Sequence, residues 1–187
     1  MTLAATSFTH RLATVEDLPE LLVLVEHAIR QLIGAYLDPE RVQASFEIMG
    51  VDRQLIDDGT YFVIEHEGRI VGCGGWSRRA TLFGHHHTAG RDGRLLDPAH
   101  EPARVRAMYT HPDFVRRGIG RRILQLCETA ARQEGFRSVE LVATVAGEPL
   151  YLAYGFAVVE RMQVPTSRGV SVPCARMVLN RFSAPRA

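Results

Sequence analysis

The sequence predicts a three-layer α/β/α sandwich with a mixed, mostly antiparallel central sheet. Two observations lead to this prediction. The elements read β, α, α, β, β, long loop, β, α, β, α, β, β along the chain, and such mixing favours helices on both faces of one sheet. The stretch 105–143 reads strand, helix, strand, which predicts a right-handed parallel crossover at the centre. The 187 residues suit one domain over 1–187, with a tail at 182–187.

The first half of the chain begins with a strand over 8–12 and a long helix. Thr14 suits a helix cap, because acidic residues follow it in the first turn. Apolar residues then recur at three- and four-residue steps, which predicts one buried stripe of Leu18, Leu21, Leu22, Val25, Ile29 and Leu32. Asp38 and Pro39 predict the start of a second helix, with a buried side of Val42, Phe46 and Met49.

A hairpin and a long connection follow. Residues 61–65 and 69–76 are rich in strand-forming residues and flank a tight turn, which predicts two paired strands. Residues 77–103 show no regular period and predict a long irregular loop. A strand is expected over 105–110.

The best-defined helix begins after Gly118. Its expected buried face holds Ile119, Ile123, Leu126 and Ala130, flanked by Leu124, Cys127 and Ala131. Glu128 is among the residues expected to point away. The remaining elements are a strand over 139–143, a short helix over 149–154, and strands over 157–164 and 174–179.

Composition excludes several classes of protein. All 22 cationic residues are arginine, so Schiff-base enzymes and P-loop phosphate sites, which need lysine, are excluded. The net charge of +1 and the pI near 7.9 favour neither nucleic acid nor an anionic membrane as a partner. Three widely spaced cysteines indicate neither a disulfide framework nor a zinc ribbon. The first residues do not read as a signal peptide, so a cytoplasmic location is expected.

An anion site is predicted where the best-defined helix begins. Gly118 and Gly120 leave room for a close approach, and the first amides of a helix favour an anion. Arg116, Arg117 and Arg121, with Arg122, crowd the same turn. Four cations there repel one another and oppose the helix dipole, and a multiply charged anion resolves that conflict. Because no third glycine follows and lysine is missing, neither the dinucleotide fingerprint nor the Walker pattern fits.

At this point the sequence resembles the GNAT (GCN5-related) N-acetyltransferase superfamily. The resemblance rests on two segments, MYTHPDFVRRGIGR at 108–121 and PLYLAYGF at 149–156, and on the element order over about residues 8–180. It implies an acyl-CoA N-acyltransferase domain with acetyl-CoA as cosubstrate. The opening Gln or Arg of the family's signature is Val115 here, and the family's common asparagine is replaced by Thr144.

The resemblance also implies residue roles. The backbone of Met108, Tyr109 and Thr110 should pair with the pantetheine arm, and Tyr151 should act as general acid toward the departing thiolate, with Tyr154 as the weaker candidate. The pyrophosphate should lie on the backbone of Arg116, Arg117, Gly118, Ile119, Gly120 and Arg121.

The predicted function is transfer of an acetyl group from acetyl-CoA to a primary amine of a small molecule or peptide by direct attack. The base stays open between a water chain and one of Glu101, Glu140 and Glu148. A catalytically silent CoA- or acyl-CoA-binding sensor is the alternative function. A homodimer is also left open.

Two further features concern the acceptor side. The loop sequence His85-His86-His87 predicts a polar entrance rather than a metal site, because consecutive residues do not easily converge on one ion. Arg104 and Arg106, on the strand before the anion site, suit either an acidic acceptor or ordinary ion pairing.

Overall fold

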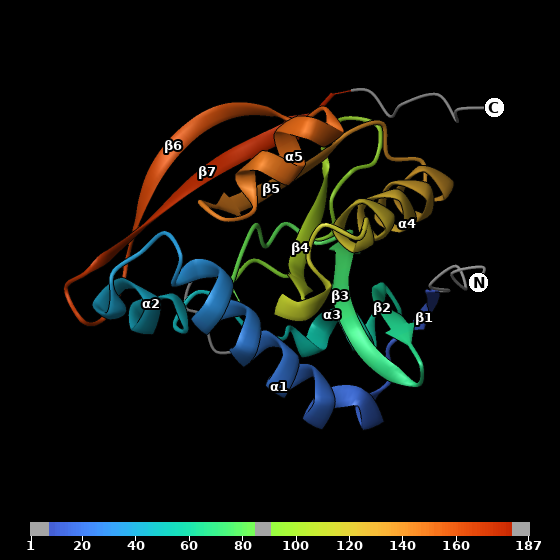
Figure 1. Ribbon diagram of the computed structural model, residues 1–187. Helices are drawn as coiled ribbons and strands as arrows, with labels where there is room; N and C mark the ends of the chain where they lie inside the picture. The colour runs from blue at the N-terminus through green and yellow to red at the C-terminus, as the bar shows by residue number, and fades with distance from the viewer. Residues whose placement is uncertain (1–7, 85–90, 181–187) are drawn as a thin grey trace.

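In the computed structural model, which describes residues 8–84 and 91–180, one seven-stranded sheet forms the centre of the molecule (Figure 1). Its strands are β1 (Thr9–Leu12), β2 (Tyr61–His66), β3 (Arg69–Ser77), β4 (Ala103–Thr110), β5 (Val139–Thr144), β6 (Ala157–Pro165) and β7 (Ser171–Leu179). They lie in the order β1-β2-β3-β4-β5-β7-β6. All neighbours are antiparallel except β4 and β5, which run parallel. The predicted mixed, mostly antiparallel sheet is therefore confirmed.

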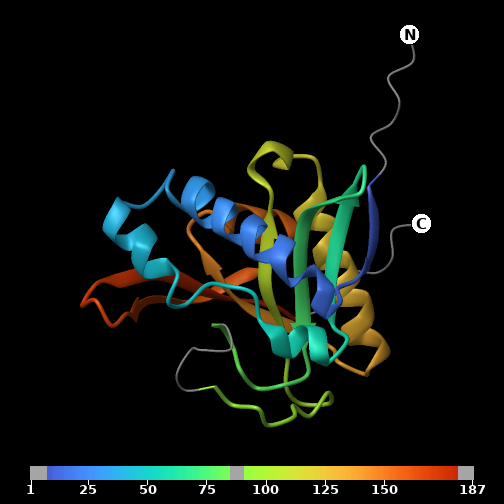
Figure 2. The ribbon, with the colours of Figure 1, turned by 90° about the horizontal axis from the view of Figure 1, so that it is seen from below.

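Helices cover both faces of this sheet. They are α1 (Leu18–Ala28), α2 (Pro39–Ser45), α3 (Arg53–Asp57), α4 (Ile119–Gln133) and α5 (Glu148–Tyr154). In Figure 2, α1 crosses in front of β3 and β4, and α4 lies behind the sheet. Alternate residues of a strand serve the two faces: Val63 packs in the cluster with α1 and α3, and Ile64 packs in the cluster with α4 and α5. The three-layer arrangement is confirmed.

The N-terminal helix begins as the sequence predicts, but its buried stripe differs. Thr14 and Asp17 form a capping box before the short 3-10 turn Val15–Asp17. Leu24 is buried, whereas Leu22 is 56% exposed, so including Leu22 in the stripe was wrong. Directly after α1, the chain continues as a π turn over Ile29–Ile33. A sequence period of 3.6 residues does not predict such a turn.

The buried face of α4 is also rotated from the predicted one. Leu124, Cys127 and Ala131 are almost fully buried beside Ile119 and Ile123, whereas Leu126 and Ala130 are only partly buried at the edge of the cluster. Glu128 points inward rather than away: it is 7% exposed and accepts a hydrogen bond from the Tyr154 hydroxyl at 2.6 Å. A buried carboxylate with a dedicated donor looks like any surface glutamate in the sequence.

The long connection after β3 is partly paired. The backbone of Ala80 bonds to Arg94, that of Thr81 to Asp92 and that of Leu96 to Arg78, which makes a short antiparallel ladder. The expectation of a wholly irregular loop over 77–103 is therefore wrong for its two ends. The predicted polar entrance at His85-His86-His87 lies outside the described residues.

A long β6–β7 hairpin extends from the sheet beside α2 (Figure 1). At its tip, the amide and hydroxyl of Ser167 donate hydrogen bonds of 2.7 and 2.9 Å to the carboxylate of Glu47. Gly169 makes the turn with φ +74°, a conformation that glycine adopts without strain. Within the described part of the chain, no helix has the length and apolarity needed to cross a membrane.

Candidate active site

The site lies where β4 and β5 diverge. These parallel strands pair only at Ala103 with Val139 and at Arg104 with Glu140. Beyond that point, within the described residues, the β5 side of β4 has no strand partner. A bulge marks the divergence, because the β3–β4 register shifts and Ala107 takes a φ of +52°. Unpaired backbone groups of Met108 and Thr110 can therefore meet an extended ligand, as a missing strand would.

A cavity of about 690 Å³ occupies this divergence, within the usual size for a ligand site. It is lined by nine of the ten residues to which the sequence assigns a role: Met108, Tyr109, Thr110, Arg116, Gly118, Ile119, Gly120, Arg121 and Tyr151. Arg117 is the exception. Its guanidinium lies over the Phe114 ring at 4.9 Å, and the residue lines a neighbouring cavity of about 330 Å³ instead.

The turn that opens α4 is built from left-handed residues. Arg116 and Gly118 have φ values of +62° and +82°. A β-carbon on Gly118 would meet no atom within 4 Å, so this glycine is required by its backbone conformation rather than by space. An arginine in the left-handed region is uncommon and stores strain, which is often found where a backbone is shaped for a ligand.

Gly120 is required for a different reason, which is the space that its side chain would occupy. A β-carbon there would lie 2.6 Å from Cδ2 of Leu150 on α5, so the glycine lets α5 approach α4. The sequence attributed both glycines to the approach of a ligand. For Gly120, the structure shows a helix–helix contact as the constraint.

The arginine side chains at this turn contact different partners, which holds their guanidinium groups apart. The Arg121 guanidinium lies 5.5 Å from the ring centroid of Tyr154, and Arg122 contacts Nδ1 of His10 at 2.9 Å. No acidic residue occupies the first turn of α4. The amides of that turn and the positive end of the helix dipole therefore face the cavity without a competing carboxylate.

Tyr151 is positioned by α5 at the inner end of this cavity. The residue is 8% exposed, and its hydroxyl donates a long hydrogen bond of 3.9 Å to Sδ of Met108 on β4. Burial raises the pKa of this phenol well above its ordinary value. Tyr151 therefore stays protonated, as a donor, next to the open strand edge.

Tyr154 is placed differently. Its hydroxyl is committed to Glu128, and burial with this carboxylate raises the pKa of the phenol. Tyr154 does not line the cavity. Of the two tyrosines on α5, only Tyr151 reaches it.

The three candidate glutamates are all engaged in ion pairs. Glu101 pairs with Arg94, which lowers the pKa of this carboxyl to about 2, and Glu148 pairs with Arg161 at 2.7 Å. Glu140 is buried and faces both Arg104 and Arg176. None of the three lines either of these two cavities, and neither does any other carboxylate or imidazole of the described residues.

Sequence reasoning missed the other wall of the cavity. This wall is formed by Gln31 and Leu32 in the π turn after α1, by Tyr36 just beyond that turn, and by Gly147 before α5. A β-carbon on Gly147 would lie 2.9 Å from the Tyr151 ring. No spacing in the sequence links residues near 31 to those near 150, because the sheet brings them together.

The sequence model of the acetyltransferase (GNAT) domain matches residues 57–158. The chain thus belongs to the GNAT acetyltransferase family, as the resemblance indicated, and acetyl-CoA follows as the cosubstrate from this membership. No curated protein matches the chain in sequence.

Solved structures agree in fold. A GCN5-related N-acetyltransferase from Rhodopseudomonas palustris superposes with a TM-score of 0.67 at 16% identity, covering 96% of this chain and 98% of that one. PaiA N-acetyltransferase from Thermoplasma acidophilum, solved in complex with coenzyme A, gives 0.63 at 13% identity over 94% and 99%. The ribosomal-protein-S18-alanine N-acetyltransferase from Escherichia coli gives 0.56 at 16% identity over 97% and 99%.

Proposed function

We propose that this protein is an N-acetyltransferase, which transfers the acetyl group of acetyl-CoA to a primary amine by direct attack, with Tyr151 as general acid. One observation carries the proposal. A single cavity joins a free strand edge, the amide-rich start of α4 and a buried, protonated tyrosine. These are the groups needed to hold an amide-containing arm, a pyrophosphate and a leaving thiolate.

The residues present fit coenzyme A in kind. The edge of β4 at Met108–Thr110 offers backbone groups to the amides of a pantetheine arm. The turn Arg116–Arg121 offers unpaired amides to a pyrophosphate, and Arg116 and Arg121 add positive charge at the cavity. When bound, acetyl-CoA supplies an activated thioester.

Tyr151 serves the departing sulfur in this proposal. As the amine nitrogen bonds to the acetyl carbon and the C–S bond breaks, the amine releases a proton to water, and the departing sulfur gains electron density and takes up a proton. A phenol that remains protonated can donate to that sulfur. Such assistance contributes roughly a hundredfold or more in rate.

The experiment that tests the proposal combines binding and turnover. Titration calorimetry with acetyl-CoA should detect binding, and a thiol-release assay with a panel of primary amines should detect CoA release that depends on the amine. Binding without thiol release from any amine would support the alternative function, a catalytically silent CoA sensor. An absence of binding would contradict both.

A further inference from the structure

A second, smaller cavity adjoins the one described above. It encloses about 80 Å³ and shares Met49, Met108, Tyr109, Thr144 and Tyr151 with the large cavity. Because Tyr151 is placed at the reacting sulfur in the proposed function, this extension is where an acceptor would lie. The larger side chains that line only this cavity are apolar except for one cation, Arg106, and they include Ile48, Leu82, Phe83, Leu141 and Val142. Polar atoms nevertheless make up most of its exposed surface.

Arg106 is the charged residue in that wall, and one of its donors has no partner. Its side chain is 2% exposed. Nη2 donates to the carbonyl oxygen of Gly84 at 2.6 Å and contacts Oδ2 of Asp52 at 2.8 Å. Nε is buried and, among the described residues, has no acceptor. Unsatisfied buried donors are rare because they are costly, and one beside a cavity indicates an acceptor that arrives with a ligand.

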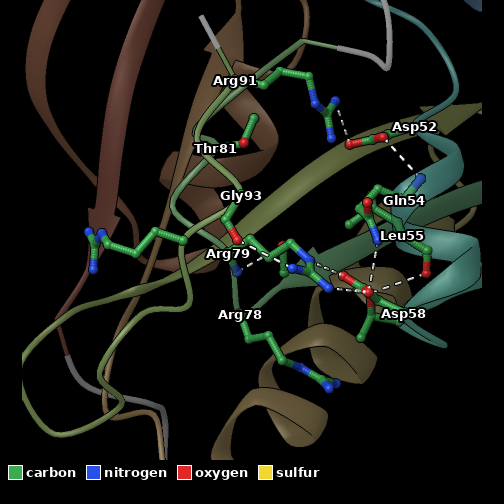
Figure 3. A network of polar contacts seen from close by, with 12 residues as sticks. Asp52, Gln54, Leu55, Asp58, Arg78, Arg79, Thr81, Arg91 and Gly93 are labelled. Carbon is green, nitrogen blue, oxygen red and sulfur yellow. Dashed lines mark hydrogen bonds and ion pairs between the residues drawn. The ribbon is translucent and has the colours of Figure 1, made fainter.

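The charge around Arg106 is also unbalanced. Asp52 is fully buried, and its Oδ2 faces a second guanidinium, that of Arg91, at 3.1 Å (Figure 3). Its Oδ1 accepts from the amide of Gln54 at 3.2 Å. Within the described residues, one carboxylate thus serves two guanidinium groups, and one positive charge remains in excess. Buried charge of one sign favours a ligand group of the other.

We infer that the acceptor of this enzyme is a small amine that also bears a carboxylate, bound by Arg106, with an apolar remainder in the surrounding wall. This inference rests on the proposed function and names its substrate class. A carboxylate supplies both missing elements, because it neutralises the excess charge and accepts from Nε. Arg106 is then a specificity-determining residue rather than a catalytic one.

An amino acid fits this arrangement. Arg106 and Tyr151 both line the small cavity, so one small ligand can contact the guanidinium while its amine lies beside the proposed reacting centre. A free amino acid, in which a single carbon joins the amine to the carboxylate, is the simplest acceptor of this kind.

The test compares matched acceptors. Alanine, valine, leucine, isoleucine, methionine and phenylalanine are each offered as the free amino acid, as the carboxamide and as the amine lacking the carboxyl group. We expect kcat/KM to be about tenfold or more higher for the best free amino acid than for its two counterparts, the range of one charged hydrogen bond. The inference is overturned if the counterparts without a carboxylate are turned over equally well or better. It is also overturned if no free amino acid is turned over.

Variants separate recognition from folding. The preference is measured as kcat/KM for the amino acid divided by kcat/KM for its carboxamide. Arg106→Met should reduce this ratio by about tenfold to a hundredfold. The intrinsic reactivities of the two acceptors cancel when the variant's ratio is divided by that of the wild type. Arg106→Lys keeps the charge but lacks Nε and should lose most of the preference. Arg94→Met is the matched control, because Arg94 pairs with Glu101 and lines neither cavity.

A structural role alone gives another result. If Arg106 only joins β4 to Asp52, Arg106→Met will lower the melting temperature and leave the ratio unchanged, and this overturns the inference. Calorimetry with acetyl-CoA on the same variants distinguishes this failure from failure of the proposed function. If the wild-type protein binds acetyl-CoA and acetylates amines without a carboxylate equally well or better, the proposed function stands. Only the inference that the acceptor bears a carboxylate is then contradicted.

Discussion

At the scale of single residues, Tyr151 is the proposed general acid. It combines burial, a raised pKa and a hydroxyl aimed at the β4 edge. Tyr154, three positions later on the same helix, has its hydroxyl occupied by Glu128. Two tyrosines of one short helix thus differ in what their hydroxyls contact, and this difference predicts different effects of the same substitution.

Tyr151→Phe should lower kcat roughly a hundredfold and leave the affinity for acetyl-CoA unchanged, because the ring still fills its place while the donor is lost. Tyr154→Phe is the matched control. It should alter kcat little but lower stability by about 1–3 kcal/mol, since the buried Glu128 loses its donor. Steady-state kinetics, calorimetry and urea unfolding measure these effects. Equal kcat values for the two variants would contradict the assignment of Tyr151.

Gly118 carries a second prediction at this scale. Alanine at φ +82° is strained by about 1–2 kcal/mol, and relief of that strain would turn the amides of the α4 turn away from the pyrophosphate. Gly118→Ala should therefore weaken acetyl-CoA binding about tenfold. Gly169→Ala, at φ +74° in the distant β6–β7 turn and equally free of nearby atoms, should lose similar stability while binding acetyl-CoA normally. Comparable losses of affinity would show that only global stability is involved.

At the scale of elements, α3 connects the sheet to the long loop through its two ends. Asp52 precedes the helix and contacts Arg91, and Asp58 follows it and holds Arg79 through two contacts of 2.7 and 2.8 Å (Figure 3). Gln54 also donates to Asp58 at 3.0 Å. A five-residue helix has little stability of its own, so these partners fix both the helix and the loop ends.

Asp58→Asn should cost about 1–2 kcal/mol at neutral pH, because Arg79, whose side chain is 31% exposed, loses a two-pronged partner. Arg79 lowers the pKa of Asp58 below 3.8. The folded protein thus binds fewer protons than the unfolded chain, and the contribution is present above about pH 4 and lost as the pH falls further. The difference in unfolding free energy between variant and wild type should therefore shrink on acidification.

Asp57→Asn provides the comparison on the same helix. Asp57 pairs with Arg53 at 4.0 Å, and both side chains are more than half exposed. Exposed pairs of this kind contribute about 0–1 kcal/mol. Urea unfolding should show a small effect, and an Asp57 effect as large as that of Asp58 would refute the role given to the α3 ends.

At the scale of the whole molecule, the fold pairs the carboxylates around the site with arginine. Glu140 and Glu148 each meet a guanidinium from another element, and Glu101 meets that of Arg94 within the connection between β3 and β4. Within the described residues, no carboxylate or imidazole lines the cavities. If no base on the protein takes up the proton of the proposed acceptor amine, the amine loses it to solvent or arrives neutral.

The pH dependence of kcat/KM should therefore follow the acceptor. Because kcat/KM reports ionisations of the free enzyme and free substrate, its logarithm should rise with pH until the pKa of the acceptor amine itself. Two acceptors whose amine pKa values differ by about 2 should show limbs displaced by the same amount. A limb at one fixed pH for both acceptors would indicate a base on the protein, and loss of that limb in Glu101→Gln, Glu140→Gln or Glu148→Gln would identify it.

Much of this architecture could be predicted because local patterns carry it. The strands and helices follow from period and caps, and the helix start at Gly118 follows from glycines and arginines whose requirements are local. The buried stripes of α1 and α4 were predicted less well. The burial of Leu22 and Glu128 depends on how their helices pack against other elements. The helical period of the sequence does not predict that packing.

The sequence by itself determined the family, the layered fold and the position of the glycine- and arginine-rich turn before α4, which is proposed to bind the pyrophosphate. It did so because a helix start and a tyrosine before Gly-Phe are contiguous features, whose geometry neighbouring residues fix. Only the tertiary structure decided which of two tyrosines meets the cavity, which glutamates are already paired, and that Arg106 has an unsatisfied donor beside a second, small cavity. Each of those depends on residues distant in the chain, brought together where two parallel strands separate.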